Sequence, residues 1–499
     1  MADRTELNSG EMQEVLKALG LQYAGTDVAQ QTQGSALVTQ DMDPVVKELT
    51  YGQNSHPILD EVQSTSTETG NELFEWTDKT STGWIEGQSR SSRAAEASEI
   101  TSQYNKRTDR VKYYATTWGT FDTLTELKNA LPAVNQEDVS ALINVKNDQS
   151  LDIWEGNSLV SPLAPNGYDY YMDNFAPARN TIDIGTAAYS ALDANGFSNP
   201  LDIERAARAA GIAVSDPSIG HGATTRLYMS AAQATDLDNA KDFFTTFVQL
   251  NDGPGNTKFT GVLKGGFNNR FGANGAATAL VVDRYIRDGA LLKPRSTRLV
   301  PGEVQSVTTK PASVTAAVAT ATALEATRFT AAFYGLMTYF VAGINAQGME
   351  STLEPITATV SAANTKITLT INQSAGAQET GYAIYRTFPG AALDANNARL
   401  IGRVAKTGAA TTFIDLNKKL PGAVTAYSWD DTVPGGFLMV RHSLKWRSVD
   451  LPRTAAGLAK KPMGAFTTMG LALPYYTRAA RLVNFVPRAG GFSPTLGNV

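Results

Sequence analysis

Two polar stretches most constrain how this chain can fold, because they lack the apolar residues that an independent fold needs. Residues 1–70 hold eleven acidic and three basic residues and contain runs such as QQTQGS and QSTSTETG. One short amphipathic helix is predicted at residues 11–19. A free arm of this composition is disordered, so order along it requires the surface of another chain.

The second polar stretch lies between β-prone segments. LFEWTD and GWIEG precede it, and VKYYATTWGTF follows it. Between them, residues 88–110 read QSRSSRAAEASEITSQYNKRTDR and offer few core candidates. We therefore predict that residues 71–118 form two strands joined by a long polar loop. That loop lies on another subunit or is a disordered surface loop.

Residues 119–302 carry helical patterns. A long helix is expected at residues 136–157, with Asn135 as its cap. A second helix at residues 203–210 ends before Gly211, and the strand TTRLYMS follows. A third helix is predicted at residues 235–250, where Asp236 and Asp238 occupy the first turn as capping carboxylates.

The composition changes near Pro301. Residues 303–432 are rich in Thr, Ala and Val, and turn signals separate short β-prone runs such as TKITLTI and GYAIYRTF. This pattern predicts a β-sandwich. Because Pro and Gly mark both junctions, we interpret it as an insertion at an exposed loop of a host domain. Residues 433–499 then return to that host.

Charge is distributed unevenly. Charged residues make up only 18% of the chain, which fits burial against copies of itself or an ordinary extracellular β-rich protein. Residues 1–70 carry a balance of −8, whereas residues 433–499 hold nine basic residues and one acidic residue. The two ends can pair, the basic end can face a polyanion, or both can be solvated surfaces.

Several classes of site are excluded or disfavoured. The absence of cysteine excludes disulfides, thiol nucleophiles and Cys-ligated zinc. No HExxH, G-x-S-x-G or phosphate-loop motif occurs, and His56, His221 and His442 lie far apart. We therefore predict no catalytic residues, no cofactor and no metal. Neither a signal peptide nor an apolar run long enough for a membrane span is found.

The order of these elements resembles the major capsid proteins of tailed bacteriophages, which have the Hong Kong 97-type shell fold. KYYATTWGTFDTL resembles the return strand of the family's E-loop, and NQEDVSALINVKNDQSLDIWEGN resembles its spine helix. The resemblance implies an α+β fold. Its parts would be an arm (1–70), an E-loop with its return strand (71–118) and peripheral and axial domains (119–302 and 433–499).

The insert, residues 303–432, resembles immunoglobulin-like and fibronectin type III domains. The residues that carry this likeness are YFVAGINAQGMES at 339–351, GYAIYR at 381–386 and TFID at 412–415. In the family, the strand that YFVAGINAQGMES resembles lies late in the domain, whereas in this insert it is the first of the three matching segments.

The capsid resemblance implies a structural protein and not an enzyme. Copies would form hexamers and pentamers of an icosahedral shell around double-stranded DNA, assembled in the host cytoplasm and located in the virion. A portal and decoration or scaffolding proteins would be further partners, with no membrane involved. Candidate interface residues are Trp76, Trp84, Arg90, Arg93, Trp118, Arg447, Arg478 and Arg481.

Three other functions stay open at this stage. A phage tail or adhesin protein would use the sandwich to bind glycans or a host surface. An encapsulin-like compartment would enclose cargo enzyme. A glycoside hydrolase would need two carboxylates placed across a cleft, which sequence alone does not exclude.

Overall fold

The computed structural model describes most of the chain beyond the N-terminal arm. The described residues are 56–64, 66–81, 86, 90, 101–121, 133–215, 222–242, 246–251, 257–263, 278–298, 308–390, 393–430, 438–442, 446–452, 460–493 and 497–498. The predicted helix at residues 11–19 lies outside them. Nearly all described residues belong to one compact unit, which comprises residues 53–118, 138–451 and 463–499. Of the other unit, only residues 119–121, 133–137, 452 and 460–462 are described.

The predicted strands on both sides of the polar loop form, but with different partners. β2 (Leu73–Ser81) pairs antiparallel with β3 (Gln103–Arg110) in a two-stranded sheet. β4 (Lys112–Phe121) instead joins β20 (Lys460–Ala472). The prediction that residues 88–110 are all loop is therefore wrong for residues 103–110. Backbone pairing with β2 forms this strand, and it needs no apolar side chains.

β20 is the centre of a larger sheet. It pairs antiparallel with β18 (Leu438–His442) and β19 (Arg447–Asp450), while β1 (Thr67–Thr69) runs parallel to β18. The short helix α3 (Pro57–Ser64) precedes β1. Ile58, Leu59 and Val62 of α3 are buried in the core of this chain, so the prediction that residues 1–70 need another chain for order is wrong for α3. The last described residues form a small pair, β22 (Phe492–Ser493) with β23 (Gly497–Asn498).

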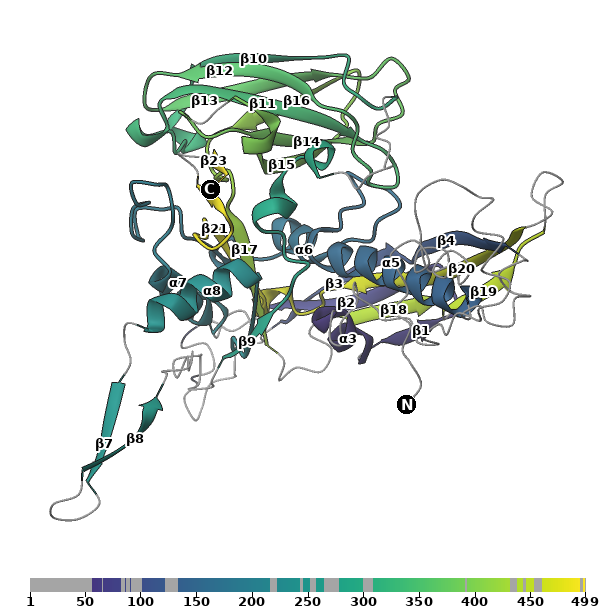
Figure 1. Cartoon of the computed structure of the whole chain (residues 1–499), viewed down its shortest axis with the longest axis horizontal. Coiled ribbons are helices and arrows are strands. Elements are labelled where there is room, and N and C mark those ends of the chain that lie inside the picture. Colours follow the sequence, from purple (N-terminus) through teal and green to yellow (C-terminus); the bar gives the residue numbers. More distant parts are fainter. Residues whose placement is uncertain are drawn as a thin grey trace, which may run out of the picture. The chain divides into compact units, whose positions relative to one another are not determined.

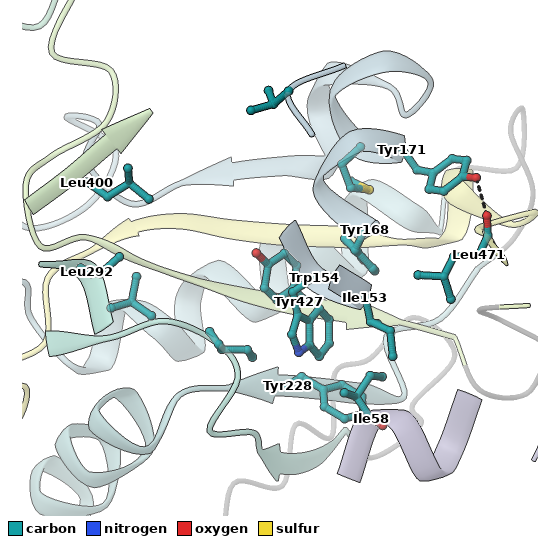
Figure 2. Close-up of a cluster of buried hydrophobic side chains, with 14 of the residues drawn as sticks. Ile58, Ile153, Trp154, Tyr168, Tyr171, Tyr228, Leu292, Leu400, Tyr427 and Leu471 are labelled. Carbon is teal, nitrogen blue, oxygen red and sulfur yellow. Dashed lines mark hydrogen bonds between the residues drawn. The ribbon is translucent and has the colours of Figure 1, made fainter. Parts of the chain in front are cut away.

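The predicted long helix is present as α5 (Ala133–Glu155). It begins earlier than expected, so Asn135 lies inside the helix and does not cap it. Near its C-terminal end, Trp154 is fully buried and stacks on Tyr427 with ring centroids 4.5 Å apart (Figure 2). The Trp154 indole donates a hydrogen bond to Asp283 at 3.1 Å. Tyr168, in the following helix α6 (Tyr168–Asn174), packs on the same indole (Figure 2).

Two further helices pack against a five-stranded mixed sheet. Its strand order is β5 (Thr181–Asp183), β21 (Ala480–Phe485), β17 (Val424–Trp429), β6 (Arg226–Met229) and β9 (Ala279–Val282). α7 (Leu201–Val214) continues past Gly211, one turn beyond the prediction. α7 packs against β21 and contributes Ile203 and Ala210 to the apolar core under this sheet.

The predicted helix at residues 235–250 is corrected. α8 (Ala231–Asp242) begins earlier and ends sooner, and β7 (Thr246–Asn251) pairs with β8 (Thr257–Leu263). The β-branched and aromatic residues of β7 favour a strand over a helix. Thr235 lies inside α8 and donates to the Ala231 carbonyl at 2.8 Å. Among the described helices, none has the length and apolar character that a membrane crossing needs.

Residues 313–415 form two antiparallel sheets that share one core (Figure 1). One sheet has the order β10 (Ser313–Thr320), β13 (Thr365–Asn372) and β16 (Ala410–Asp415). The other has the order β12 (Glu354–Val360), β11 (Gly335–Ile344), β14 (Gly381–Arg386) and β15 (Arg399–Ala405).

Two details of the predicted insert differ from the structure. Residues 313–320 form a strand that the sequence analysis did not single out. Residues 424–429, inside the predicted range 303–432, form β17 and pair with β6 and β21 outside the sandwich. Alternating apolar residues identify a strand, but its pairing partner depends on chain segments far away in sequence.

Candidate subunit-interface surfaces

The β2–β3 hairpin contacts the rest of the chain through Arg107 on β3. Asp78 on β2 is buried and pairs with Arg107 on β3. The Arg107 guanidinium lies 3.8 Å from the centre of the Phe175 ring and donates to the Tyr476 hydroxyl at 3.3 Å. Burial raises the pKa of Asp78, although the Arg107 hydrogen bond opposes this shift. The contacts that β3 makes through Arg107 thus reach α6 and the C-terminal region.

Trp76 belongs to this attachment. Its indole stacks on Phe74 at 5.6 Å and meets the edge of Tyr171 at 6.1 Å. Tyr171 is buried and donates a hydrogen bond to the Leu471 carbonyl at 2.7 Å (Figure 2). Trp76 therefore packs on its own chain, and this contact accounts for the aromatic side chain without a partner subunit.

The side chains of the hairpin strands are mostly exposed. The first four residues of β3 are exposed, half-buried and exposed residues alternate after them, and none of its eight residues is buried. Tyr104 is 62% exposed, and the Lys79 ammonium lies 5.8 Å from its ring centre. The Lys106–Glu75 ion pair is also exposed. β3 therefore buries little apolar surface against its own chain, whereas β2 buries Phe74 and packs Trp76 on the core.

An open cleft lies where the hairpin begins. Its volume is about 760 Å³, and it is lined by Thr67, Thr69, Asn71, Glu72, Leu73, Phe74, Glu75 and Arg110. Leu73 is 53% exposed at this cleft. The exposed Tyr113 on β4 donates a hydrogen bond from its hydroxyl to the Glu72 carboxylate at 2.6 Å. Mixed charges beside an exposed leucine suit contact with a polypeptide segment.

The other predicted interface residues are dispersed. Trp118 on β4 is half-buried, and its indole nitrogen is buried without a hydrogen-bond partner. Arg447 is exposed at the start of β19, and Arg90 is exposed. Trp84 and Arg93 lie outside the described residues.

Arg478 and Arg481 are paired within the chain. Arg478 lies 3.6 Å from Asp430, and Arg481 forms ion pairs with Asp169 and Asp173. Burial alone would lower the pKa of Arg481, but these two carboxylates raise it. Of the predicted acidic arm, residues 56–64 and 66–70 are described, and there β1 pairs with β18, with Glu68 opposite Arg441 in the strand register. Arg478 and Arg481 instead use acidic residues elsewhere in the folded chain.

A cluster of charges that the sequence analysis missed connects α5 to the sandwich. Glu155 at the end of α5 pairs with Arg287 at 2.7 Å and with Arg403 of β15 at 3.0 Å. Arg403 also lies 3.9 Å from Glu350, which accepts a hydrogen bond from Tyr385 at 2.6 Å. No sequence spacing relates residue 155 to residue 403, so only the folded chain brings them together.

Two further polar candidates, His56 and Asp236, have structural contacts. His56 is buried and lies 2.9 Å from the Asn147 side chain and 2.7 Å from the Tyr285 hydroxyl. Asp236 is not a helix cap as predicted; its carboxylate accepts a hydrogen bond from the Ala489 amide at 2.9 Å. Within the described part of the chain, no group of three His, Asp or Glu residues is arranged to hold a metal ion.

Solved structures of viral and related shells are similar to this chain. A capsid structure of the cyanophage P-SCSP1u has a TM-score of 0.41 and 9% identity, over 93% of this chain and 97% of that chain. The capsid of a native GTA particle has a TM-score of 0.39 and 11% identity, over 93% and 99%. The chain is similar to phage capsid structures over nine tenths of its length.

The holo-SrpI encapsulin complex from Synechococcus elongatus PCC 7942 is also similar, with a TM-score of 0.35 and 8% identity over 93% of this chain and 97% of that chain. No protein-family model and no curated protein matches the chain. Because these TM-scores and identities are low, the function is inferred from the contacts within the chain.

Proposed function

We propose that this chain is the major capsid subunit of a tailed phage. Copies self-assemble into hexamers and pentamers of an icosahedral shell, which encloses double-stranded DNA in the virion. The observation that carries the proposal is the β2–β3 hairpin, whose strands, among those that the structure describes, pair only with each other and leave most of their side chains exposed.

An isolated two-stranded hairpin is marginally stable in water. Here the contacts of Arg107 and Trp76 attach the hairpin to its own chain, and its remaining surface has little cover from that chain. A neighbouring subunit can supply that cover, and a closed ring repeats the contact at every subunit. A typical specific interface buries roughly 1,600 Å², an area that an extended hairpin can contribute to without a large apolar core.

The proposed contact with DNA is electrostatic and non-specific. Because Arg478 and Arg481 already have carboxylate partners, they are poor candidates for phosphate contact. Arg447 is exposed on β19 and is the better candidate among the described arginines of the C-terminal end. Portal, scaffolding and decoration proteins are further partners that the proposal implies.

Electron microscopy of the purified full chain tests the proposal. Hollow shells are the expected result, and only monodisperse monomers at every protein concentration and salt concentration would refute it. Particles from the natural source should hold nuclease-protected double-stranded DNA. Protein cargo in its place would favour an encapsulin-like compartment.

A pair of matched variants tests the role of the hairpin. Tyr104→Ser changes an exposed hairpin residue and should lower the yield of shells without altering thermal unfolding of the monomer. Leu324→Ser changes a side chain that is 97% exposed and lies between β10 and β11, so it serves as the control and should leave the yield unchanged. Equal yields from both variants would count against hairpin-mediated assembly.

A further inference from the structure

The four edge strands of the sandwich differ in how they are protected against pairing with another chain. Natural sheets protect their edges with charges, prolines, bulges or short strands. β12 carries Glu354 and Pro355. β15 carries Arg399 and Arg403, and its pairing with β14 contains a register shift. β16 has six residues and ends at Asp415.

β10 has none of these protections. Its eight residues, SVTAAVAT, include no charge and no proline, and its ladder with β13 is regular from Ser313 to Thr320. Among the described strands that form a sheet edge, β10 is the longest with neither a charge nor a proline. Five of its residues are exposed: Thr315, Ala317, Val318, Ala319 and Thr320.

The exposed side chains of β10 are also small. Val318 is the largest, and it is 48% exposed. Another strand can therefore approach the β10 backbone closely, and each main-chain group on the free edge can form a hydrogen bond with it. A long, regular, uncharged edge in water is an association site unless something covers it.

We propose that β10 pairs antiparallel with β10 of a second copy of this chain, about a two-fold axis perpendicular to the sheet. The pairing would join two three-stranded sheets into one six-stranded sheet. The proposal rests on the proposed function for the supply of many identical copies. It goes beyond that function, because the contact lies on the sandwich and not on the hairpin.

The sequence of β10 suits this self-pairing. With the axis at Ala317, Ala316 lies opposite Val318 and Thr315 lies opposite Ala319 on the second copy. Opposing residues then share a face of the sheet, as an antiparallel ladder requires. No like charges meet, and no pair is bulky. A charge at Ala317 would face its own copy at the axis, so an uncharged residue there suits a two-fold contact.

Single cysteines test the pairing, because the chain has no cysteine of its own. Residues directly opposite each other in antiparallel strands have Cα atoms about 4.5–5.5 Å apart, which is within disulfide range. Ala317→Cys and Ala316→Cys cover the two central registers. Thr359→Cys, an exposed position on the protected edge strand β12, is the matched control. Each full-length variant is oxidised and examined on a non-reducing gel.

Covalent dimers from Ala317→Cys or Ala316→Cys, with none from Thr359→Cys, are expected. No dimer from either β10 variant, or as much dimer from Thr359→Cys, overturns the proposal. Adding Val318→Lys to the crosslinking variant places a charge on the edge and should abolish the dimer. A dimer that persists at full yield also overturns the proposal.

Electron microscopy of the same samples separates this proposal from the proposed function. Shells that form without β10 crosslinks refute only the strand pairing. Crosslinked dimers in samples that never form shells refute the capsid function and leave the strand pairing supported.

Discussion

The Tyr114 hydroxyl on β4 donates a hydrogen bond to the Asp152 carboxyl on α5 at 2.6 Å. This contact joins the strand that follows the hairpin to the long helix. Burial raises the pKa of Asp152 from 3.8 to about 7; the Tyr114 hydrogen bond opposes the shift and the nearby Asp148 adds to it. Arg403 and Arg287 also oppose it. Asp152 therefore titrates near neutral pH within the contact between β4 and α5.

The first prediction concerns pH. Because the pKa of Asp152 is higher in the folded chain than in the unfolded chain, its contribution to stability is complete below about pH 3.8. That contribution is lost as pH rises from 3.8 to about 7, and the full cost of ionisation applies above this range. Asp152→Asn should thus raise the unfolding temperature relative to the natural chain at pH 8, and the gain should shrink toward pH 5.

Glu155→Gln is the control for the pH prediction, because the sign is opposite. Arg287 and Arg403 hold the pKa of Glu155 below its usual value even though burial opposes them. Loss of this charge should lower stability at pH 8 and matter less as pH falls through the pKa of Glu155. Thermal unfolding measured across pH checks both variants. An Asp152→Asn variant that is equally destabilised at pH 5 and pH 8 would contradict the prediction.

The second prediction concerns a buried ion pair inside the sandwich. Arg386 is fully buried and pairs with Asp415, which also accepts a hydrogen bond from Tyr339 at 2.7 Å. Arg386→Met would leave the Asp415 charge buried without its partner and should cost about 3–5 kcal/mol of unfolding free energy. Lys366→Met removes the more exposed pair with Glu325 and should cost much less, because solvent screens an exposed pair. Denaturant unfolding compares the two, and similar losses would refute the assignment.

The third prediction concerns close backbone packing at Gly343 on β11. A Cβ atom at this position would lie 1.8 Å from the Thr309 carbonyl oxygen, so the backbone would have to move. Gly343→Ala should destabilise the sandwich by about 1–3 kcal/mol or more. Gly408→Ala is the control, since nothing lies within 4 Å of the Cβ that it adds. Calorimetry of the full chain measures both, and an unchanged transition for Gly343→Ala would refute this packing.

The fourth prediction separates two tryptophans. Trp76 packs on Phe74 and Tyr171, so Trp76→Ala should lower the stability of the monomer itself, by up to about 3–5 kcal/mol. Trp84 lies outside the described residues, and its predicted role is contact with a neighbour. Trp84→Ala should lower particle yield while the monomer stays folded. Monomer unfolding and particle counts are measured together, and a stable Trp76→Ala monomer would contradict the packing role.

Local patterns were sufficient to predict elements whose cause is local. The aromatic and β-branched residues of LFEWTD and KYYATTWGTF predicted strands, which are present as β2 and β4. The helix at residues 136–157 corresponds to α5, and runs such as TKITLTI alternate in burial along β13 as a half-buried strand does. The same local patterns failed at residues 246–250, where helical spacing competed with β-branched and aromatic residues and a strand is present.

The sequence by itself determined which segments are strands and helices and which are too polar to form a core, because backbone preference and apolar spacing act between near neighbours. Only the tertiary structure decided that Asp78 pairs with Arg107, that Arg403 meets Glu155 and that β17 leaves the sandwich for another sheet. Strand register and charge pairing depend on which distant segments exclude water together. That selection is made by packing the whole chain, so no local spacing encodes it.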